Sequence, residues 1–221
     1  MKWQYYTPVF LYESLFPNLK DLSAWSGHRR FAYDLTRFLN PGSVAELGTH
    51  YGLSFFSFCQ AVADSGTSAK CYAIDTWLGD AHSGFYDESV YSVFNLIKDT
   101  FYKDAAVPLR NTFDGAQPLF PDESIDILHI DGFHTYEAVK HDYLTWLPKL
   151  AKNGVVLLHD IAERGNGFGV YLLWEELKIY PHLEFAHSHG LGVVCPKGCP
   201  KSLKDVFEHA DELRGRYATI G

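Results

Sequence analysis

The chain has 221 residues, of which 47% are hydrophobic and 16% aromatic, and it carries a formal net charge of −8. This composition excludes a disordered chain, and the length suits one α/β domain with terminal additions. The acidic balance argues against a nucleic-acid substrate, because phosphate backbones attract basic surfaces. No apolar run reaches the roughly 18 residues of a membrane span, and no signal-peptide core is visible, so we expect a cytoplasmic protein.

The ends of the chain differ from its middle. Residues 1–25 are aromatic and interrupted by prolines, without a helical or strand period. We expect them to form an arm that packs across the domain, or against a second copy in a homodimer. The main domain then covers residues 26–200, and a polar helix or tail covers residues 201–221.

Between these ends, apolar periodicity and turn residues predict helices that alternate with strands. The predicted helices cover residues 26–39, 54–63, 88–102, 135–152, 170–180 and 202–217. The predicted strands cover residues 43–47, 71–75, 107–111, 125–131 and 154–158, followed by a hairpin of 183–187 and 191–194. This order predicts a Rossmann-like α/β fold, with a seven-stranded, mostly parallel sheet, a C-terminal antiparallel hairpin and helices on both faces.

The first strand leads into a glycine-containing turn, in the sequence SVAELGTHYGLS from Ser43 to Ser54. Strand-to-helix turns of this kind hold nucleotide-like ligands, because glycines admit the ligand and the helix N-terminus offers N–H donors. The spacing differs from the dinucleotide pattern G-x-G-x-x-G, and an acid before the turn suits a ligand with an ammonium and a sulfonium. An ordinary turn is the alternative. We predict an S-adenosylmethionine (SAM) site that includes Glu46, Gly48, Thr49, His50, Gly52 and Ser54.

The next two strand ends add candidates for the rest of the cofactor. Asp75 ends the second strand and can accept both hydroxyls of a ribose. Thr76 and Trp77 follow it, and the indole of Trp77 either stacks on adenine or packs in the core. After the third strand, Asp114 or a neighbouring backbone group would meet the adenine amine.

The fourth and fifth strands end in carboxylates and imidazoles. Asp131 is followed by Gly-Phe-His134, and the fifth strand runs into His159 and Asp160. The fold sets these loops side by side, so the four side chains would meet at the mouth of the pocket, where Asp131 also borders the cofactor. Methyl transfer needs an aligned acceptor oxygen and a base for its proton. Asp131, His134 and His159 are therefore the catalytic candidates.

Several ordered segments resemble class I SAM-dependent methyltransferases. More narrowly, they are similar to a bacterial group found with glycosyltransferases in glycan loci, and to the macrocin and rhamnosyl O-methyltransferases. The resemblance covers roughly residues 25 to 195 and rests on WSGHRRFAYDL, VAELGTHYGLSFFSFCQAV, CYAIDTWLGD, IDILHIDGFHTYEAVKHDYLTWLPKL, GVVLLHDI, WEELK and HGLGVV. It implies O-methylation of a sugar hydroxyl on a glycan or a glycosylated natural product, with a small-molecule or glycan acceptor.

The resemblance also implies a metal-assisted site. Asp131 and Asp160 would hold Mg²⁺ or Mn²⁺, with His159 as a further ligand, and His134 becomes the preferred base, since an unperturbed imidazole has a pKa of about 6.5. The chain departs from the macrolide enzymes, which carry an acidic pair at the end of strand five and Asp-Gly-Asp at the end of strand four. Here His159 and Phe133 replace two of those carboxylates. A metal-free mechanism with His134 or His159 as base is therefore an alternative.

Two other functions fit parts of the sequence. Tyr136 and Lys140 match the Tyr-x-x-x-Lys pair of NAD-dependent short-chain dehydrogenases, but the pair follows strand four, whereas in that family it follows strand five. A non-catalytic domain that binds SAM as a scaffold or sensor is the second alternative. The carboxylates and imidazoles at the strand ends argue against it.

Overall fold

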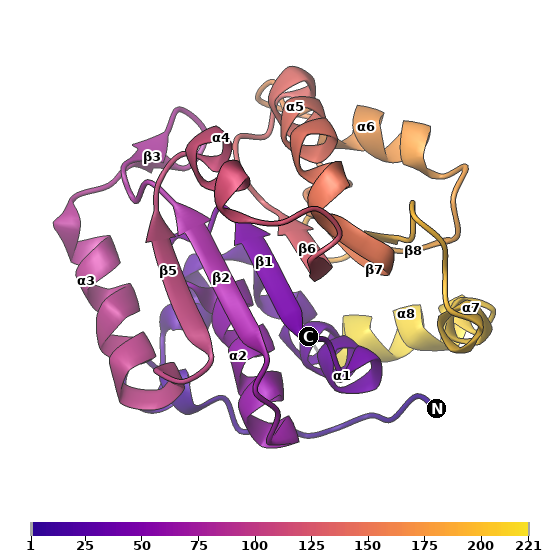
Figure 1. Ribbon diagram of the computed structural model, residues 1–221, viewed down its shortest axis with the longest axis horizontal. Coiled ribbons are helices and arrows are strands. Elements are labelled where there is room, and N and C mark those ends of the chain that lie inside the picture. The colour runs from indigo at the N-terminus through magenta and orange to yellow at the C-terminus, as the bar shows by residue number, and fades with distance from the viewer. Residues whose placement is uncertain (1, 221) are drawn as a thin grey trace.

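A seven-stranded sheet organises the computed structural model, which describes residues 2–220 (Figure 1). Its strand order is β5-β2-β1-β6-β7-β9-β8, and β9 runs antiparallel to both of its neighbours while the other pairs are parallel. This confirms the predicted fold class, including the C-terminal hairpin. The strands are β1 (Ser43–Leu47), β2 (Lys70–Asp75), β5 (Ala106–Arg110), β6 (Ile125–Ile130), β7 (Leu150–His159), β8 (His182–Phe185) and β9 (Leu191–Val194).

Helices cover both faces of the sheet, because successive strand residues point to opposite faces and both sets are apolar. One apolar cluster joins α1, α2, α3, α7 and α8 to the sheet, and the other joins α4, α5 and α6 to the opposite face. The helices are α1 (Arg29–Leu39), α2 (Leu53–Ser65), α3 (Glu88–Ile97), α4 (Phe113–Ala116), α5 (Tyr136–Trp146), α6 (Val170–Leu177), α7 (Lys201–Phe207) and α8 (Ala210–Ile220).

Three parts of the structure differ from the prediction. No strand was predicted within residues 79–85, where the structure has a small antiparallel ribbon of β3 (Gly79–Asp80) and β4 (Gly84–Phe85). Helix α5 ends at Trp146 and a 3₁₀ turn carries Pro148, because proline removes a helical N–H and its ring clashes with the preceding turn. The predicted C-terminal helix is divided into α7 and α8.

The N-terminal arm packs against its own domain. Figure 1 shows it running below the sheet towards α3, and it continues as three 3₁₀ turns, η1 (Leu11–Ser14), η2 (Leu19–Leu22) and η3 (Ala24–His28). Phe10, Tyr12, Leu19 and Trp25 are all buried in the cluster that covers α1 and α2. Met1 and Gly221, the outer ends of the predicted arm and tail, lie outside the described residues.

The strand order creates a switch point between β1 and β6, since the chain moves outward through β2 and β5 and then returns to the other side of β1. The loops after β1 and β6 are consequently in contact, and the Asp131 N–H donates to the Leu47 carbonyl at 2.8 Å. Open α/β sheets bind ligands at the carboxyl ends of strands at such a point. The fold therefore predicts a ligand site between residues 48–54 and 131–134.

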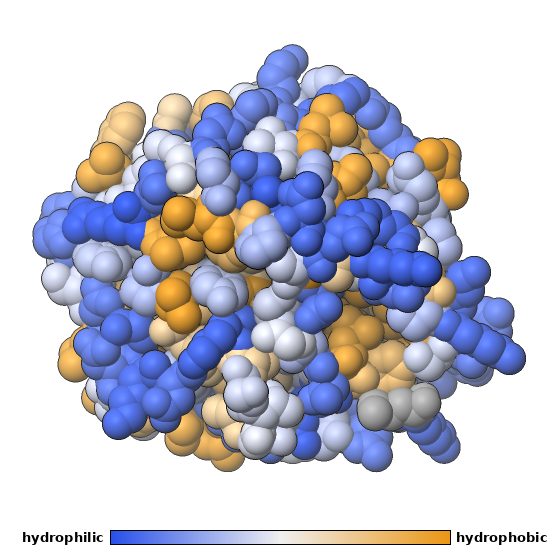
Figure 2. Space-filling model, viewed as in Figure 1, coloured by the Kyte–Doolittle hydropathy of each residue, from blue (hydrophilic) through white to orange (hydrophobic). Residues whose placement is uncertain are grey.

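The surface seen in Figure 2 is mostly hydrophilic, with smaller hydrophobic areas between the polar side chains. Within residues 2–220, no helix combines the length and apolar character needed to cross a bilayer.

Candidate active site

A cavity of about 470 Å³ opens at the switch point. Its volume falls in the range of roughly 300–1,000 Å³ that is typical of small-molecule sites. The walls come from the turn after β1, the β3–β4 ribbon, the loops after β2, β5, β6 and β7, the β8–β9 turn, and the arm. The arm contributes Leu19, Leu22, Ser23 and Ala24.

The glycine turn is held close to the neighbouring loop. Gly48 has φ +88°, and a Cβ atom there would lie 2.1 Å from the Asp131 carbonyl oxygen. Gly52 also has φ +88° and is the N-cap residue of α2, but contrary to the prediction it does not line the cavity, because its Cα faces the Phe56 and Phe94 rings. Among the predicted cofactor residues of this turn, Gly48, Thr49, His50 and Ser54 line the cavity.

Glu46 lies away from the cavity, contrary to the prediction. It is fully buried on the sheet face that packs against α1 and α2, and its Oε2 is 2.8 Å from Nδ1 of His129. Strand alternation explains the direction, because Glu46 shares its face with Val44 while Ala45 and Leu47 point to the other. Direct contact between Glu46 and the ligand is therefore not supported.

Asp75 and Thr76 line the cavity as predicted, but Trp77 does not. The Asp75 carboxylate accepts backbone N–H bonds from Thr49, His50 and Trp77 at 2.7–2.9 Å, so it ties β2 to the glycine turn. The Trp77 indole is fully buried, and its Nε1–H donates to the His50 carbonyl at 2.8 Å. Core packing, and not adenine stacking, is the role that the structure gives to Trp77.

Asp114 is also outside the cavity. Thr112 caps α4 by accepting the Gly115 N–H, and this directs Asp114 outward, where it pairs with His141 at 2.8 Å. The neighbouring residues Thr112 and Phe113 line the cavity instead. The prediction that the Asp114 side chain meets adenine is therefore wrong, while the alternative of a neighbouring group stays open.

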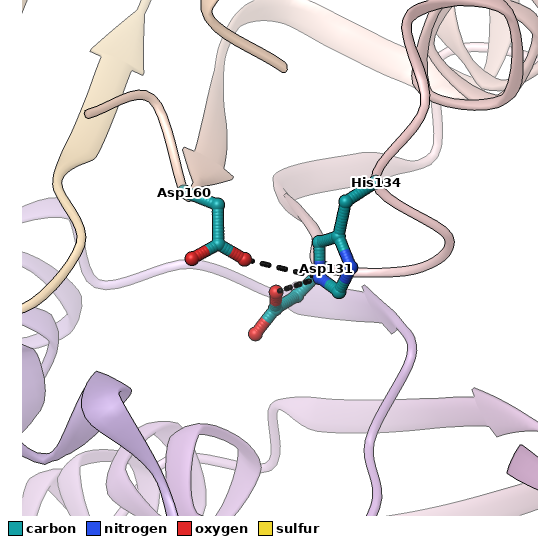
Figure 3. A group of neighbouring side chains, drawn as sticks. All are labelled: Asp131, His134 and Asp160. Carbon is teal, nitrogen blue, oxygen red and sulfur yellow. Dashed lines mark ion pairs between the residues drawn. The ribbon is translucent and has the colours of Figure 1, made fainter. Parts of the chain in front are cut away.

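The strand ends of β6 and β7 bring four predicted residues together, and we call Asp131, His134, His159 and Asp160 the Asp–His cluster. Figure 3 shows three of them, Asp131, His134 and Asp160. Nε2 of His134 is 3.0 Å from Oδ2 of Asp160 and 3.6 Å from Oδ1 of Asp131. Nδ1 of His159 lies 3.4 Å from Oδ1 of Asp131 and 3.3 Å from Oδ2 of Asp160. All four residues line the same cavity as the glycine turn.

Mutual contacts set the charge of this cluster. Burial alone would lower the pKa of His134, but the hydrogen-bonding carboxylates of Asp131 and Asp160 raise it to about 9. The same balance raises the pKa of His159 to about 10. Burial would raise the pKa of Asp131, yet His159 and His134 hold it well below its usual value. The cluster therefore combines carboxylates with protonated imidazoles near neutral pH.

The side chains of the cluster carry ligand atoms that can bind a divalent cation. One ligand atom each from Asp131, His134 and Asp160 lie within 4.8 Å of one another, so this group contains both predicted carboxylates but has His134 where His159 was predicted. Carboxylate oxygens suit Mg²⁺ and Mn²⁺, and an imidazole nitrogen favours the transition metal of the two. To bind an ion, the carboxylates would exchange their contacts with imidazolium N–H groups for contacts with the metal.

Further residues of the site were not predicted from the sequence. His189 lines the cavity from the β8–β9 turn, with Nδ1 3.3 Å from Oδ1 of Asp160. Phe133 and Phe168 form an aromatic wall, and the Phe168 ring lies parallel to His134 with a centroid distance of 4.6 Å. Turn residues and a glycine-rich loop were visible at these positions, but their approach to the strand ends depends on tertiary packing.

The structure does not place the Tyr-x-x-x-Lys pair of the dehydrogenase alternative at the cavity. The Tyr136 hydroxyl and Lys140 Nζ contact each other on α5, and both contact Glu176 of α6. Neither Tyr136 nor Lys140 lines the cavity. A Tyr-x-x-x-Lys pair outside the cavity cannot serve a reaction inside it.

An open α/β sheet with a ligand-sized cavity at its switch point defines a Rossmann-like ligand-binding protein. Residues 45–161, more than half of the chain, match the sequence model of a family described as a methyltransferase domain, and the chain belongs to that family. The protein y4gI of Sinorhizobium fredii (strain NBRC 101917 / NGR234), described as uncharacterized, is 45% identical over 173 residues, or 78% of this chain. The chain spans 19% of the length of that relative.

Solved methyltransferase structures share the fold. A methyltransferase from Geobacter sulfurreducens has a TM-score of 0.61 at 17% identity, over 85% of this chain and 87% of its own. The O-methyltransferase TomG from Streptomyces achromogenes, involved in tomaymycin synthesis and solved with SAM, has a TM-score of 0.62 at 12% identity, over 86% and 87% of the two chains. At these identities the similarity concerns the fold alone.

Proposed function

We propose that the chain is a SAM-dependent O-methyltransferase that modifies a sugar hydroxyl on a glycan or a glycosylated natural product. The observation that carries this proposal is that the Asp–His cluster and the glycine turn line one cavity. A methyl donor and a proton acceptor can thus meet in the same space. Membership of the methyltransferase family and the SAM complex of TomG support the choice of cofactor.

The cofactor would extend along the carboxyl ends of β1, β2 and β5. Gly48, Thr49 and Ser54 would surround its amino-acid end, where the backbone comes close to the ligand. Asp75 would accept the ribose hydroxyls with the lone pairs that its backbone contacts leave free. The adenine would then reach Thr112 and Phe113, which line the cavity beyond β5.

In the reaction, the acceptor oxygen attacks the methyl carbon of the sulfonium in line with the departing sulfur. A C–O bond forms as the C–S bond breaks, the electron pair stays on sulfur, and the hydroxyl proton passes to His134. His134 must first lose the proton that its carboxylate partners stabilise. Alignment and general-base catalysis together supply the rate enhancement, with about 10²–10⁴-fold from the base.

We include a divalent ion in the proposal. Asp131, Asp160 and His159 would hold Mg²⁺ or Mn²⁺, and a bound ion would lower the pKa of the acceptor hydroxyl. When the two carboxylates bind an ion, they no longer stabilise the proton on His134, which leaves that imidazole available as the base.

The aromatic wall supports a sugar acceptor. Phe133 and Phe168 stand beside His134 and offer flat apolar surfaces at the place where the acceptor must enter. The C–H face of a sugar ring can pack on such surfaces while its hydroxyls contact the Asp–His cluster. The resemblance to sugar O-methyltransferases favours the same class of acceptor.

The test combines binding and activity. Calorimetric titration with S-adenosylhomocysteine (SAH), with and without Mg²⁺, measures cofactor binding, and a labelled-methyl screen of sugar acceptors measures transfer. We expect His134→Gln to bind SAH normally and to lose about 10²–10⁴-fold in transfer. His209→Gln is the matched control, because the His209 side chain is exposed, lies outside the cavity and hydrogen-bonds the Asp205 carbonyl. Wild-type transfer by His134→Gln, or no SAH binding by the natural sequence, would contradict the proposal.

A further inference from the structure

A buried hydrogen-bond chain connects the N-terminal arm to the glycine turn, and the proposed reaction does not use it. Nε1 of Trp25 is 3.1 Å from Nε2 of His129, and Nδ1 of His129 is 2.8 Å from Oε2 of Glu46. The three side chains are 1%, 0% and 0% exposed. They come from η3, β6 and β1, three elements that are far apart in the sequence.

The chemistry of the three groups fixes which atom donates and which accepts in each of these hydrogen bonds. An indole N–H is only a donor, so Nε2 of His129 must be unprotonated to accept it. The proton of the neutral imidazole is then on Nδ1, which donates to the Glu46 carboxylate. Trp25 therefore fixes the tautomer of His129, and that tautomer holds one oxygen of Glu46.

The other oxygen of Glu46 has no partner. Oε1 is buried and makes no hydrogen bond within the described residues. Burial raises the pKa of Glu46, while His129 and the nearby Ser54 hydroxyl oppose the rise. A buried carboxylate oxygen without a donor is costly, and such groups call for a functional explanation.

Ser54 connects this carboxylate to the cavity. It stands in the first turn of α2, is 5% exposed, and lines the cavity next to the glycine turn. A positively charged group at Ser54 would supply the counter charge that Glu46 lacks. The residues directly before Trp25 also line this cavity, namely Leu19, Leu22, Ser23 and Ala24.

We infer that Trp25, His129 and Glu46 are positioning residues that couple the docking of arm residues 19–25 to the binding of the amino-acid end of the cofactor. The inference rests on the proposed function, because it takes SAM as the ligand. Trp25 acts through His129 and Glu46, and Glu46 acts through Ser54 on the ammonium end. Coupling of this kind is reciprocal, so the bound cofactor also stabilises the docked arm.

The first test compares two ligands. SAH has the amino-acid end, whereas 5′-methylthioadenosine has the same nucleoside without it. We expect Trp25→Phe and Glu46→Gln to raise the Kd for SAH by about tenfold or more, and to leave the Kd for 5′-methylthioadenosine within about twofold. A merely structural role would weaken both ligands equally.

Trp146→Phe is the matched control. Trp146 is as deeply buried as Trp25, but its Nε1 has no hydrogen-bond partner among residues 2–220, and it belongs to the cluster on the other sheet face. It loses the same ring volume and no hydrogen bond, so we expect an SAH affinity within about twofold of the natural sequence.

Hydrogen exchange on the unmodified chain tests the coupling without any substitution. We expect SAH to slow exchange of the amides of residues 19–25 more than 5′-methylthioadenosine does. Equal protection by both ligands, or equal weakening of both by Trp25→Phe and Glu46→Gln, would overturn the inference while SAH binding upholds the cofactor. Failure of the natural sequence to bind SAH would instead overturn the proposed function itself.

Discussion

Position 48 requires glycine, because the loops after β1 and β6 approach each other closely there. Its φ of +88° disfavours side chains, and a Cβ atom would meet the Asp131 carbonyl at 2.1 Å. That oxygen belongs to the backbone of the loop after β6, so it cannot move aside without moving the Asp–His cluster. The close contact between the β1 and β6 loops therefore depends on the absence of a side chain.

We expect Gly48→Ala to lower the free energy of unfolding by more than about 2 kcal/mol and to abolish SAH binding. Gly66→Ala is the control, because Gly66 has φ +65° but open space around its Cβ position, so only the backbone cost of about 1 kcal/mol applies. Urea denaturation measures both losses. Equal losses for the two variants would show that the contact with Asp131 is not what requires glycine.

Single residues differ in how far the sequence could place them. Asp131 and Asp160 were predictable, because the ends of neighbouring parallel strands meet at one edge whatever the details of packing. Glu46 was predicted at the ligand but lies away from the cavity, and for Trp77 the structure has core packing, one of its two predicted alternatives. Their roles depend on which sheet face a side chain takes and on what fills it, and His129, the partner of Glu46, is 83 positions away in the chain.

At the scale of elements, α1 and α8 meet through one carboxylate. Asp34 of α1 accepts hydrogen bonds from the Tyr217 hydroxyl of α8 and from the Tyr6 N–H of the arm. Burial raises the pKa of Asp34 to about 6, although these two bonds oppose the rise. The contact joins the two ends of the chain on one face of the sheet, and its strength depends on the protonation of Asp34.

This shift predicts a pH dependence of stability. The folded state binds the Asp34 proton more tightly than the unfolded chain does, where the pKa is near 3.8. The contribution of Asp34 is thus fully present below that value and is lost as the pH rises through about 6. We expect Asp34→Asn to remove this part of the pH dependence between about pH 4 and pH 7 in urea denaturation.

Asp211→Asn is the control for that experiment, since the Asp211 side chain is fully exposed. It should follow the pH dependence of the natural sequence. If Asp34→Asn also followed it, the carboxyl would titrate at the same pH in both states, and the α1–α8 contact would carry no proton linkage.

Elements with strong local signals were predicted best. β1 has the bounds that its apolar run and flanking turn residues indicate, from Ser43 to Leu47. The β3–β4 ribbon was not predicted, because strands of two residues are too short to show an alternating pattern. The two helices after Pro200 were read as one, since polar residues continue through the break and only packing on α1 and β8 separates them.

For the whole molecule, packing argues that the predicted arm (1–25) and domain (26–200) are not independent units. The arm buries Phe10, Tyr12, Leu19 and Trp25 in the cluster that covers α1 and α2. Packing across the domain was one of the two predicted placements of the arm, but its low periodicity did not indicate which side chains are buried, because its contacts follow the shape of the domain and not a regular face. The same arm lines the cavity, so stability and the site share one segment.

We therefore expect a chain that starts at Ser26 to lose cooperative unfolding and SAH binding. Burial of the four apolar arm side chains contributes roughly 1.5–3 kcal/mol each, and the sum is comparable to the 5–15 kcal/mol by which whole domains are stable. A chain that starts at Trp3 is the control, because Lys2 is exposed. Circular dichroism during urea denaturation distinguishes the two outcomes: a sharp transition in the chain from Ser26 would make residues 26–221 a domain by themselves, and the arm would be an accessory to it.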